Sequence, residues 1–292
     1  MVFHPPVAIV AKAGDAGKYK VGLPAWNMLL RGFMAGAYIA MGGALATVCS
    51  TGIMATDAAL RYGTASAGFS QLITGAVFPV GLIIIVLTGA ELFTGDAMLA
   101  PMAAFIHKVT WAQVLNLWVW VYIGNLIGSI VYAYIMAYGP LSSWDATGAV
   151  TVTAFGTRAI GIAVAKTSYV SMAGQWSCFL KAIGCNWLVN LAVLLGICAD
   201  DLIGKFFGIW FPIMCFVSTG FEHSVANMYF IPAGIMTQGF ITDPTKINAG
   251  LTWVTFWTNN LINVTIGNIV GGMFFVGVIY WVAFRKEIAA LK

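Results

Sequence analysis

Six long apolar tracts follow one another along this chain, and they constrain its fold more than any other feature. They run approximately over residues 26–50, 66–107, 112–138, 175–199, 203–238 and 253–284. A helix that crosses the roughly 30 Å hydrocarbon core of a bilayer needs about 20 apolar residues. Only 8% of the residues are charged, against about a quarter in soluble domains. We therefore expect an all-α membrane protein with six transmembrane helices.

The second and fifth tracts are too long for one straight span, and polar residues interrupt each of them near its middle. Gly89 and Glu91 stand at the first interruption, and Gly220 and Glu222 stand at the second. Irregular backbone at membrane depth is tolerated only where protein covers it or where it lines a watery cavity. We expect the second and fifth helices to be broken beside a pathway. A packing kink at each glycine is the alternative.

An internal repeat is indicated by features that recur in one register. The third and sixth tracts share the motif Gly-Asn-x-x-Gly, which contains Asn125 in one and Asn268 in the other. A proline follows the break glycine at the same spacing in both halves, at Pro101 and Pro232. Each half then holds three spans, and an odd number of spans makes the second half enter the membrane from the opposite side. The expected architecture is two inverted three-helix repeats.

The charges and tracts together divide the chain into five expected parts. These are a cytoplasmic arm at 1–25, a first repeat at 26–138, an extracellular connecting loop at 139–174, a second repeat at 175–285 and a cytoplasmic tail at 286–292. Nine basic residues fall on or nearest the side of the termini: Lys12, Lys18, Lys20, Arg31, Lys108, Lys205, Arg285, Lys286 and Lys292. Five fall on the other side: Arg61, Arg158, Lys166, Lys181 and Lys246. Basic residues gather on the cytoplasmic side of membrane proteins, so both termini are expected in the cytoplasm of a cell-membrane protein.

Four ordered segments carry a resemblance to a known family. They are Gly89–Thr94 (GAELFT), Cys185–Val189 (CNWLV), Gly220–Met228 (GFEHSVANM) and Val264–Asn268 (VTIGN). They resemble the signature segments of the formate/nitrite transporter family, and the match extends over all six spans. The resemblance implies an aquaporin-like protomer in a homopentamer, with one pore through each protomer. It also implies transport of a small monovalent anion, namely formate, nitrite or hydrosulfide, and in some members lactate or acetate.

The resemblance further assigns residues to the pore. It implies a central histidine, His223, facing Thr94 on the broken second helix, with Asn186 nearby. It implies hydrophobic constrictions at Phe78, Leu82, Leu92, Phe93, Val189 and Phe216. It places the lysine of the outer vestibule at Lys166, although the stretch between Lys166 and Asn186 is a few residues longer than is usual for the family.

Physical chemistry favours neutral passage through such a pore. Moving a bare anion into a medium of low dielectric costs roughly 20 kcal/mol in the idealised case. Protonating a carboxylate at pH 7 costs only about 4 kcal/mol, since its pKa lies about three units lower. His223 is the single histidine inside a predicted span, and imidazole is the side chain that titrates near neutrality. We therefore hypothesise that His223 donates a hydrogen bond or a proton to the anion, with Thr94 orienting it.

The intramembrane carboxylates Glu91 and Glu222 are costly unless they are paired or hydrogen bonded. Because a pore-lining glutamate would repel anions, we expect both to accept hydrogen bonds from free amides at the breaks. We assign Asn125 and Asn268 to the same structural network around the breaks. The sequence is compatible with two roles for these asparagines, a hydrogen bond between closely packed helices or a place in the lining of the pore.

Other classes of protein fit the chain less well. An aquaporin would carry Asn-Pro-Ala at both half-helices, and this sequence has no Asn-Pro. A membrane-integral redox subunit needs clustered histidines or other metal ligands, so no cofactor or metal is expected. A structural subunit would leave the two polar breaks unexplained, and no basic cluster indicates nucleic acid. The expected partners are the anion, protons, the lipid bilayer and further copies of the chain. Formate is the expected anion, with nitrite and hydrosulfide as alternatives.

Overall fold

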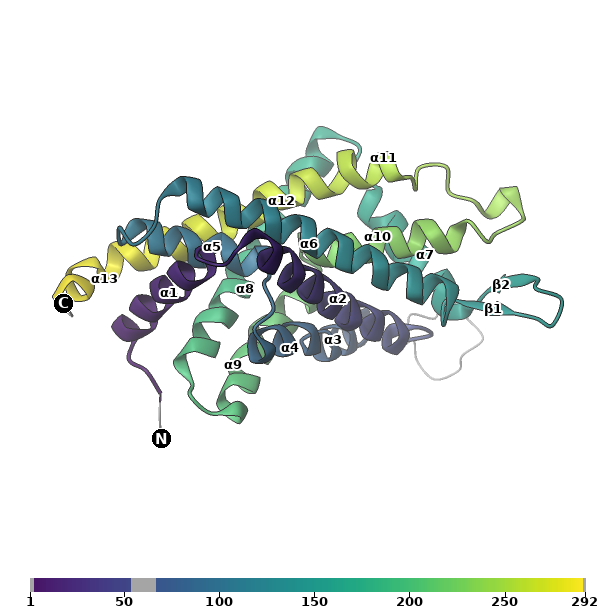
Figure 1. Ribbon diagram of the computed structural model, residues 1–292. Helices are drawn as coiled ribbons and strands as arrows, with labels where there is room; N and C mark the ends of the chain where they lie inside the picture. The colour runs from purple at the N-terminus through teal and green to yellow at the C-terminus, as the bar shows by residue number, and fades with distance from the viewer. Residues whose placement is uncertain (1–2, 54–66, 291–292) are drawn as a thin grey trace.

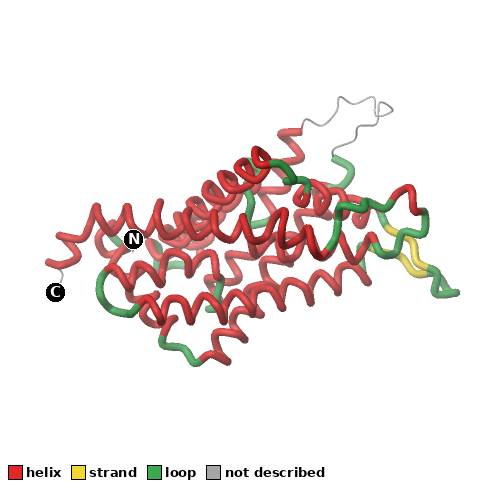
Figure 2. Tube along the Cα trace, turned by 90° about the horizontal axis from the view of Figure 1, so that it is seen from above, coloured by secondary structure: helices red, strands yellow, loops and turns green. Residues whose placement is uncertain are grey.

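Helices make up nearly all of the computed structural model, which describes residues 3–53 and 67–290. Figure 1 shows long helices lying side by side, with α1 and α13 at one end of the molecule and a small hairpin at the other. Figure 2, seen from above, shows the same elongated bundle. The hairpin pairs β1 (Ser142–Trp144) with β2 (Val150–Val152) in antiparallel register. Arg61 and Lys292, two residues used to predict orientation, lie outside the described residues.

The helices of the first half precede the hairpin. They are α1 (Pro6–Val21), α2 (Ala25–Ser50), α3 (Ala67–Val77), α4 (Val80–Thr88), α5 (Phe93–Phe105) and α6 (Trp111–Tyr138). The helices of the second half follow it. They are α7 (Ala154–Thr167), α8 (Met172–Cys198), α9 (Leu202–Ser218), α10 (Ser224–Gln238), η1 (Pro244–Lys246), α11 (Trp253–Thr255), η2 (Phe256–Leu261), α12 (Ile262–Ile269), η3 (Val270–Val278) and α13 (Ile279–Ala290).

Helices fill most of the six apolar tracts. Five described helical runs are long and apolar enough to cross a bilayer: Ala25–Ser50, Gly68–Thr88, Trp111–Tyr138, Met172–Cys198 and Trp253–Ala290. The shorter apolar helix α9 supplies the remaining tract together with α10. The last run contains two stretches of π-helix, η2 and η3, which the sequence pattern did not predict. The fold is that of a multi-pass helical membrane protein.

Both interruptions lie where the sequence predicts them. Helix α4 ends at Thr88 and α5 begins at Phe93, while α9 ends at Ser218 and α10 begins at Ser224. Gly89 and Gly220 have φ values of 76° and 72°. This left-handed backbone is readily adopted by glycine but is strained for a residue with a Cβ atom. The two glycines therefore end their helices and turn the chain at the same point in each half.

Helices also occur in the segments predicted as the arm 1–25 and the connecting loop 139–174. Helix α1 packs on α5, and α7 packs on α10. The contact of α1 is close, because a Cβ atom at Gly17 would lie 2.0 Å from the carbonyl oxygen of Leu99. Both helices are too short to be recognised as spans from their length, and they are less apolar than the spans. Each of them brings a lysine to one of the breaks.

The Gly-Asn-x-x-Gly motifs bring neighbouring helices into backbone contact. In α6, a Cβ atom at Gly128 would lie 1.9 Å from the carbonyl oxygen of Phe33 in α2. In η3, a Cβ atom at Gly271 would lie 2.4 Å from the carbonyl oxygen of Ile183 in α8. Small residues permit this approach where helices pack in a membrane. The approach also brings the asparagine of each motif within reach of a break.

Candidate functional site

The break between α4 and α5 is held by one asparagine side chain. The Oδ1 atom of Asn125 accepts a hydrogen bond of 2.9 Å from the backbone N–H of Phe93. Its Nδ2 atom donates to the carbonyl oxygens of Glu91, at 2.9 Å, and Gly32, at 2.8 Å. A free helix end buried without partners would cost several kcal/mol. Asn125 therefore supplies partners that the interrupted backbone lacks.

The break between α9 and α10 is held in the same way. The Oδ1 atom of Asn268 accepts a hydrogen bond of 2.8 Å from the backbone N–H of Ser224. Its Nδ2 atom donates to the carbonyl oxygens of Glu222, at 3.0 Å, and Ala182, at 2.8 Å. Corresponding backbone groups are thus bound in both halves. The structure uses both asparagines in contacts between helices and breaks.

The glutamate side chains at the breaks pair with cations and do not accept hydrogen bonds from the free backbone amides, which corrects the expectation from the sequence. Glu91 forms ion pairs with Lys20 of α1 and, at 3.7 Å, with Arg31 of α2. Lys20 also lies 3.1 Å from Asp96. The asparagine side chains and helix carbonyls already bind the backbone amides at the breaks. The carboxylates are therefore free to pair with charges that α1 and α7 bring.

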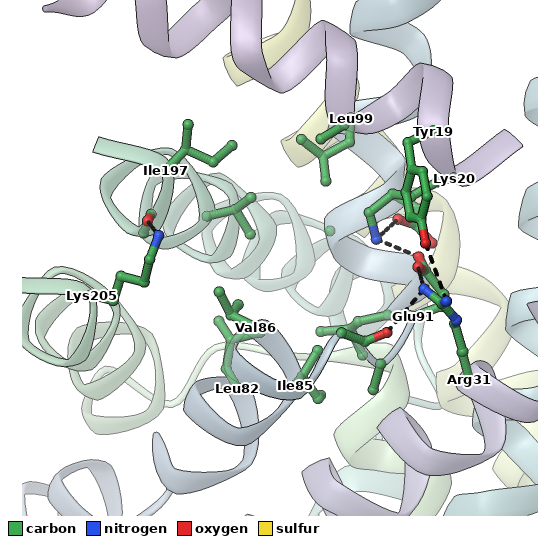
Figure 3. Close-up of a pocket in the computed structure, with 18 residues that line it drawn as sticks. Tyr19, Lys20, Arg31, Leu82, Ile85, Val86, Glu91, Leu99, Ile197 and Lys205 are labelled. Carbon is green, nitrogen blue, oxygen red and sulfur yellow. Dashed lines mark hydrogen bonds and ion pairs between the residues drawn. The ribbon is translucent and has the colours of Figure 1, made fainter. Parts of the chain in front are cut away.

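Burial and charge act in opposite directions on Lys20. Burial disfavours the charged ammonium, but the Asp96 and Glu91 carboxylates outweigh this effect and hold the pKa of Lys20 above its usual range. Lys20 therefore remains charged and joins α1 to the first break. Figure 3 shows Lys20, Arg31 and Tyr19 gathered around Glu91 at one edge of a cavity.

The corresponding group in the second half is centred on Glu222. Its carboxylate accepts hydrogen bonds from Lys166 at 2.9 Å, Tyr169 at 2.9 Å and Asn227 at 2.7 Å. Burial, followed by the nearby Glu222 carboxylate, raises the pKa of the Tyr169 hydroxyl. Tyr169 therefore stays a hydrogen-bond donor. The resemblance assigns Lys166 to a vestibule. Lys166 does line a cavity, but its ammonium forms an ion pair with Glu222.

An apolar plug lies between the two breaks. It consists of buried side chains that surround a gap with no room for a water molecule. They are Ile39, Phe78, Leu82, Leu92, Val189, Ile213 and Phe216, with His223 at the edge. The rings of Phe78 and Phe216 meet edge to face, with centroids 5.9 Å apart. Five of the six residues predicted for the constrictions are thus brought together.

Phe93, the sixth predicted constriction residue, lies apart from the plug. Its ring meets Tyr122 edge to face with centroids 4.9 Å apart, and it meets Trp118 at 6.0 Å. It borders a surface groove with residues of α6 and with Thr265. Successive residues at the start of a helix point in different directions. Leu92 therefore faces the plug, whereas Phe93 faces α6.

Two cavities approach the plug from opposite sides. The α1 cavity, of about 260 Å³, contains Lys20, Glu91 and Lys205 and reaches Leu82 and Leu92 of the plug. The α7 cavity, of about 340 Å³, contains Lys166, Glu222 and Arg158 and reaches the plug at Phe78, Phe216 and His223. The order along the molecule is therefore cavity, plug and cavity.

His223 lies where the plug meets the α7 cavity. It is 2% exposed, and its ring stacks on Phe216 with centroids 5.7 Å apart. Its Nδ1 atom accepts a hydrogen bond of 3.0 Å from the backbone N–H of Ala226 and so caps α10. Its Nε2 atom lies 2.8 Å from the Oγ1 atom of Thr94. The structure therefore brings His223 and Thr94 together across the two breaks.

Asn186 holds Thr94 from the side of α8. Its Nδ2 atom donates to the carbonyl oxygens of Thr94, at 3.0 Å, and Asn268, at 2.6 Å. Asn190 also donates to the carbonyl of Thr94, at 3.1 Å. The Oδ1 atoms of both asparagines are buried without a hydrogen-bond partner. Two amide side chains thus position the backbone of Thr94.

Several residues of this arrangement were not singled out by sequence reasoning. Asn190 follows Asn186 by one helical turn, and that spacing would have placed both on one face of α8. Ile39 and Ile213 could not be distinguished from other apolar residues of their helices. The sequence marks Lys20 only as a cytoplasmic charge, because nothing in it shows that α1 folds onto the first break.

The described residues contain no group of three or more His, Cys, Asp or Glu side chains that could hold a metal ion. The chemistry available is that of charged cavities, an apolar plug and a hydrogen-bonding pair. A model of the family described as formate/nitrite transporter matches residues 7–282 of the chain.

This chain belongs to the formate/nitrite transporter family.

Relatives over the full length agree with this membership. A probable formate transporter of Methanothermobacter thermautotrophicus is 44% identical, covering 96% of this chain and 97% of its own length. The formate channel BtFdhC of Bacillus thuringiensis is 37% identical over all of both chains. A solved structure described as a pentameric formate channel with formate bound has a TM-score of 0.73 and 32% identity, over 90% of this chain and 98% of its own.

The family consists of channels and transporters, so this member is a membrane transport protein and not an enzyme. Its helices share the family's fold. The cavities and plug described above accordingly mark the candidate transport pathway within one chain.

Proposed function

We propose that this family member is a homopentameric formate channel of the plasma membrane, with one proton-coupled pathway through each protomer. The observation that carries the proposal is the order of α1 cavity, plug and α7 cavity, with His223 at the junction. The relatives described as formate transporters and channels support the substrate. The pentameric formate channel of similar fold supports the assembly.

The plug requires the anion to lose its charge before crossing. It is lined by Phe, Leu, Ile and Val side chains, which offer no hydrogen bond to replace lost water. A bare anion would face a cost of several kcal/mol even after relaxation, whereas taking up a proton at pH 7 costs about 4 kcal/mol. Formate therefore crosses as formic acid, and each anion carries one proton.

His223 is assigned the role of a neutral hydrogen-bond donor. Because the N–H of Ala226 occupies the Nδ1 atom, the ring carries its proton on Nε2. A second proton on Nδ1 would break the cap of α10 and place a positive charge at a helix N-terminus, where the dipole disfavours it. The Nε2–H group therefore binds the arriving anion, and a proton from the bulk solution, reaching the anion through water of the α7 cavity, neutralises it.

Thr94 orients this donor at the boundary of the plug. Its Oγ1 atom faces Nε2 of His223 at 2.8 Å, and Asn186 and Asn190 hold its backbone carbonyl. When the anion accepts the bond from His223, the Thr94 hydroxyl is free to donate to the same anion. The pair then binds a small carboxylate at two points.

Both termini are proposed to lie in the cytoplasm. Helices α1 and α13 lie at one end of the molecule (Figure 1), and the sequence assigns the larger set of basic residues to the side of the termini, which is the cytoplasmic side in membrane proteins. On this orientation the α1 cavity opens toward the cytoplasm and the α7 cavity opens toward the exterior.

Anion flux in proteoliposomes tests the proposal. Formate, nitrite and hydrosulfide are added outside in turn, at two pH values, while an internal dye reports pH. The formate flux through the protein should acidify the lumen and rise about tenfold for each unit that the pH falls, because the acid fraction grows by that factor. Protein-free liposomes give the background. Flux of nitrite alone would overturn the formate assignment, and formate flux without acidification would overturn the proton coupling.

His223→Phe and His223→Gln separate the two roles of the ring. Phenylalanine offers no hydrogen bond and should abolish the protein-dependent flux. Glutamine keeps a donor and should retain part of the flux with an unchanged dependence on pH. A flatter pH dependence in His223→Gln would mean that the ring itself titrates during transport, and the neutral-donor role would then be wrong.

A further inference from the structure

Each cavity contains one cation that has no ion pair with a described acidic side chain. In the α1 cavity, Lys20 is paired with Glu91 and Asp96. In the α7 cavity, Lys166 is paired with Glu222. Arg158 and Lys205 line the same cavities, and neither has an ion-pair partner among residues 3–53 and 67–290. The charges nearest the breaks are therefore paired, whereas Arg158 has no ion pair and Lys205 has only the exposed carboxylate of Asp200 near enough to interact with it electrostatically.

Arg158 lies on the face of α7 that borders the cavity. The lining residues Arg158, Gly161, Ala165 and Lys166 follow helical spacing. The Nε atom of Arg158 is buried and has no hydrogen-bond partner. A Cβ atom added at Gly161, one turn away, would meet no heavy atom within 4 Å. An arginine without an ion pair thus lines the cavity, beside open space at Gly161.

Lys205 occupies a comparable position in the α1 cavity but comes from a different element. It lies in the first turn of α9, and its Nζ atom donates to the carbonyl oxygen of Gly196 near the end of α8, at 2.8 Å. This bond fixes the ammonium without cancelling its charge, and two N–H groups stay available. Figure 3 shows Lys205 across the cavity from the group of Lys20, Arg31 and Glu91.

An ion pair and a lone cation act differently on an approaching anion. The field of a close pair falls off quickly, because the carboxylate cancels most of the field of the cation. A lone cation in a cavity with low-dielectric walls attracts anions over a Debye length of about 8 Å at physiological salt. A guanidinium also offers two parallel N–H groups to one carboxylate.

We infer that an anion that enters a cavity binds to the unpaired cation there, which is Arg158 in the α7 cavity and Lys205 in the α1 cavity. Lys166 and Lys20 instead hold the broken helices in place. The inference rests on the proposed function, because it assumes that a small monovalent anion passes both cavities. It adds two anion-binding residues that lie on non-corresponding helices.

The test compares half-saturation concentrations for formate from the two sides. Right-side-out and inside-out membrane vesicles from cells that express the chain expose one cavity each to the added anion. Arg158→Gln should raise the half-saturation concentration about tenfold at low ionic strength when the α7 cavity faces the anion, and about twofold or less at high salt. Lys205→Gln should do the same from the α1 side. Arg158→Lys, which keeps the charge, should restore most of the loss.

Matched variants remove the same charge elsewhere at each end. Lys246→Gln removes an exposed charge in η1, shortly after α10, where Lys246 pairs with Asp243 at 3.4 Å, and Lys18→Gln removes an exposed charge on α1. Neither should change the half-saturation concentration. If the chain has the opposite orientation, the two effects exchange vesicle types and still support the inference.

Two results would contradict the inference. One is an unchanged half-saturation concentration in both glutamine variants, with normal pentamer yield on size exclusion. The other is an equal shift in the matched variants, which would indicate a general surface potential. If the wild type carries nitrite and no formate, the proposed substrate is wrong, while the same comparison made with nitrite still decides whether Arg158 and Lys205 collect the anion.

Discussion

In the first half, the break between α4 and α5 carries Glu91, Leu92 and Asp96. In the second half, the break between α9 and α10 carries Glu222, His223 and Asn227 at the corresponding positions. The residues that hold the backbone are equivalent in the two halves: a left-handed glycine, a glutamate paired with a lysine, and an asparagine whose side chain binds the backbone of the break. We call this asparagine, Asn125 or Asn268, the asparagine clamp.

The difference between the halves lies in the residues between these supports. The plug receives Leu92 from one side and His223 from the other. The glutamate has a carboxylate neighbour, Asp96, in the first half and an amide neighbour, Asn227, in the second. The comparison indicates that the supports serve the fold, and that function depends on the positions where the halves differ.

Removing an asparagine clamp should have the largest effect on stability. Asn125→Leu and Asn268→Leu would each leave one buried N–H and two buried carbonyl groups without their partner, at about 1–3 kcal/mol for each group. Both variants should give little folded protein in detergent, to a similar extent. Asn116→Leu is the control, since the one side-chain hydrogen bond of Asn116 within the described part of the chain is a weak one, to the sulfur of Met28 at 3.9 Å. A strong loss in one half alone would show that the clamps are not equivalent.

Exchanging the amide and carboxylate neighbours of the two glutamates, Asn227 and Asp96, should have the next largest effect on stability. Asn227→Asp would place a carboxylate where an amide now donates to Glu222 at 2.7 Å, so it should destabilise the fold by several kcal/mol through repulsion at a buried site. Asp96→Asn should cost less, because Lys20 keeps its partner Glu91. Thermal unfolding of the purified variants measures the difference. Equal losses would contradict the assigned pairing.

Replacing each glutamate with glutamine should give a smaller difference in stability between the two halves. Glu222→Gln leaves Lys166 without a carboxylate partner, at a cost of about 3 kcal/mol for a broken buried pair. Glu91→Gln leaves Lys20 paired with Asp96 at 3.1 Å and should cost less. Combining Glu91→Gln with Asp96→Asn should raise the loss to the level of Glu222→Gln. Thermal unfolding again provides the measurement, and a loss in Glu91→Gln as large as in Glu222→Gln would contradict the role of Asp96.

The smallest expected effect on stability concerns its pH dependence, at the α1 end of the molecule and outside the membrane spans. The hydrogen bond from His4, at 2.8 Å, holds the pKa of Asp200 below its usual range. A depressed carboxyl pKa contributes stability that is present above the ordinary value of about 4 and is lost as pH falls through the lower folded value. Asp200→Asn should therefore slightly flatten the fall in stability below about pH 4, measured by thermal unfolding. Asp15→Asn, at another exposed carboxylate of this end, shows whether the effect is specific.

Much of the fold could be predicted from residue patterns. The lengths of the apolar tracts predict the spans, and Gly89 and Gly220 predict the breaks, because only a few local interactions decide each of these features. The motif around Asn125 and Asn268 predicts close helix contacts for the same reason. The pairing of His223 with Thr94 was available only as an implication of the family resemblance, since the two residues lie far apart along the chain, one in each half.

The sequence by itself determined that this chain is a membrane protein with two interrupted helices, because hydrophobic length and glycine conformation are local properties. Only the tertiary structure decided which apolar side chains close the path, why Phe93 is not among them, and which cations are paired. Those outcomes depend on contacts among α1, α7 and the breaks, where a charge is neutralised or left free by residues distant in sequence.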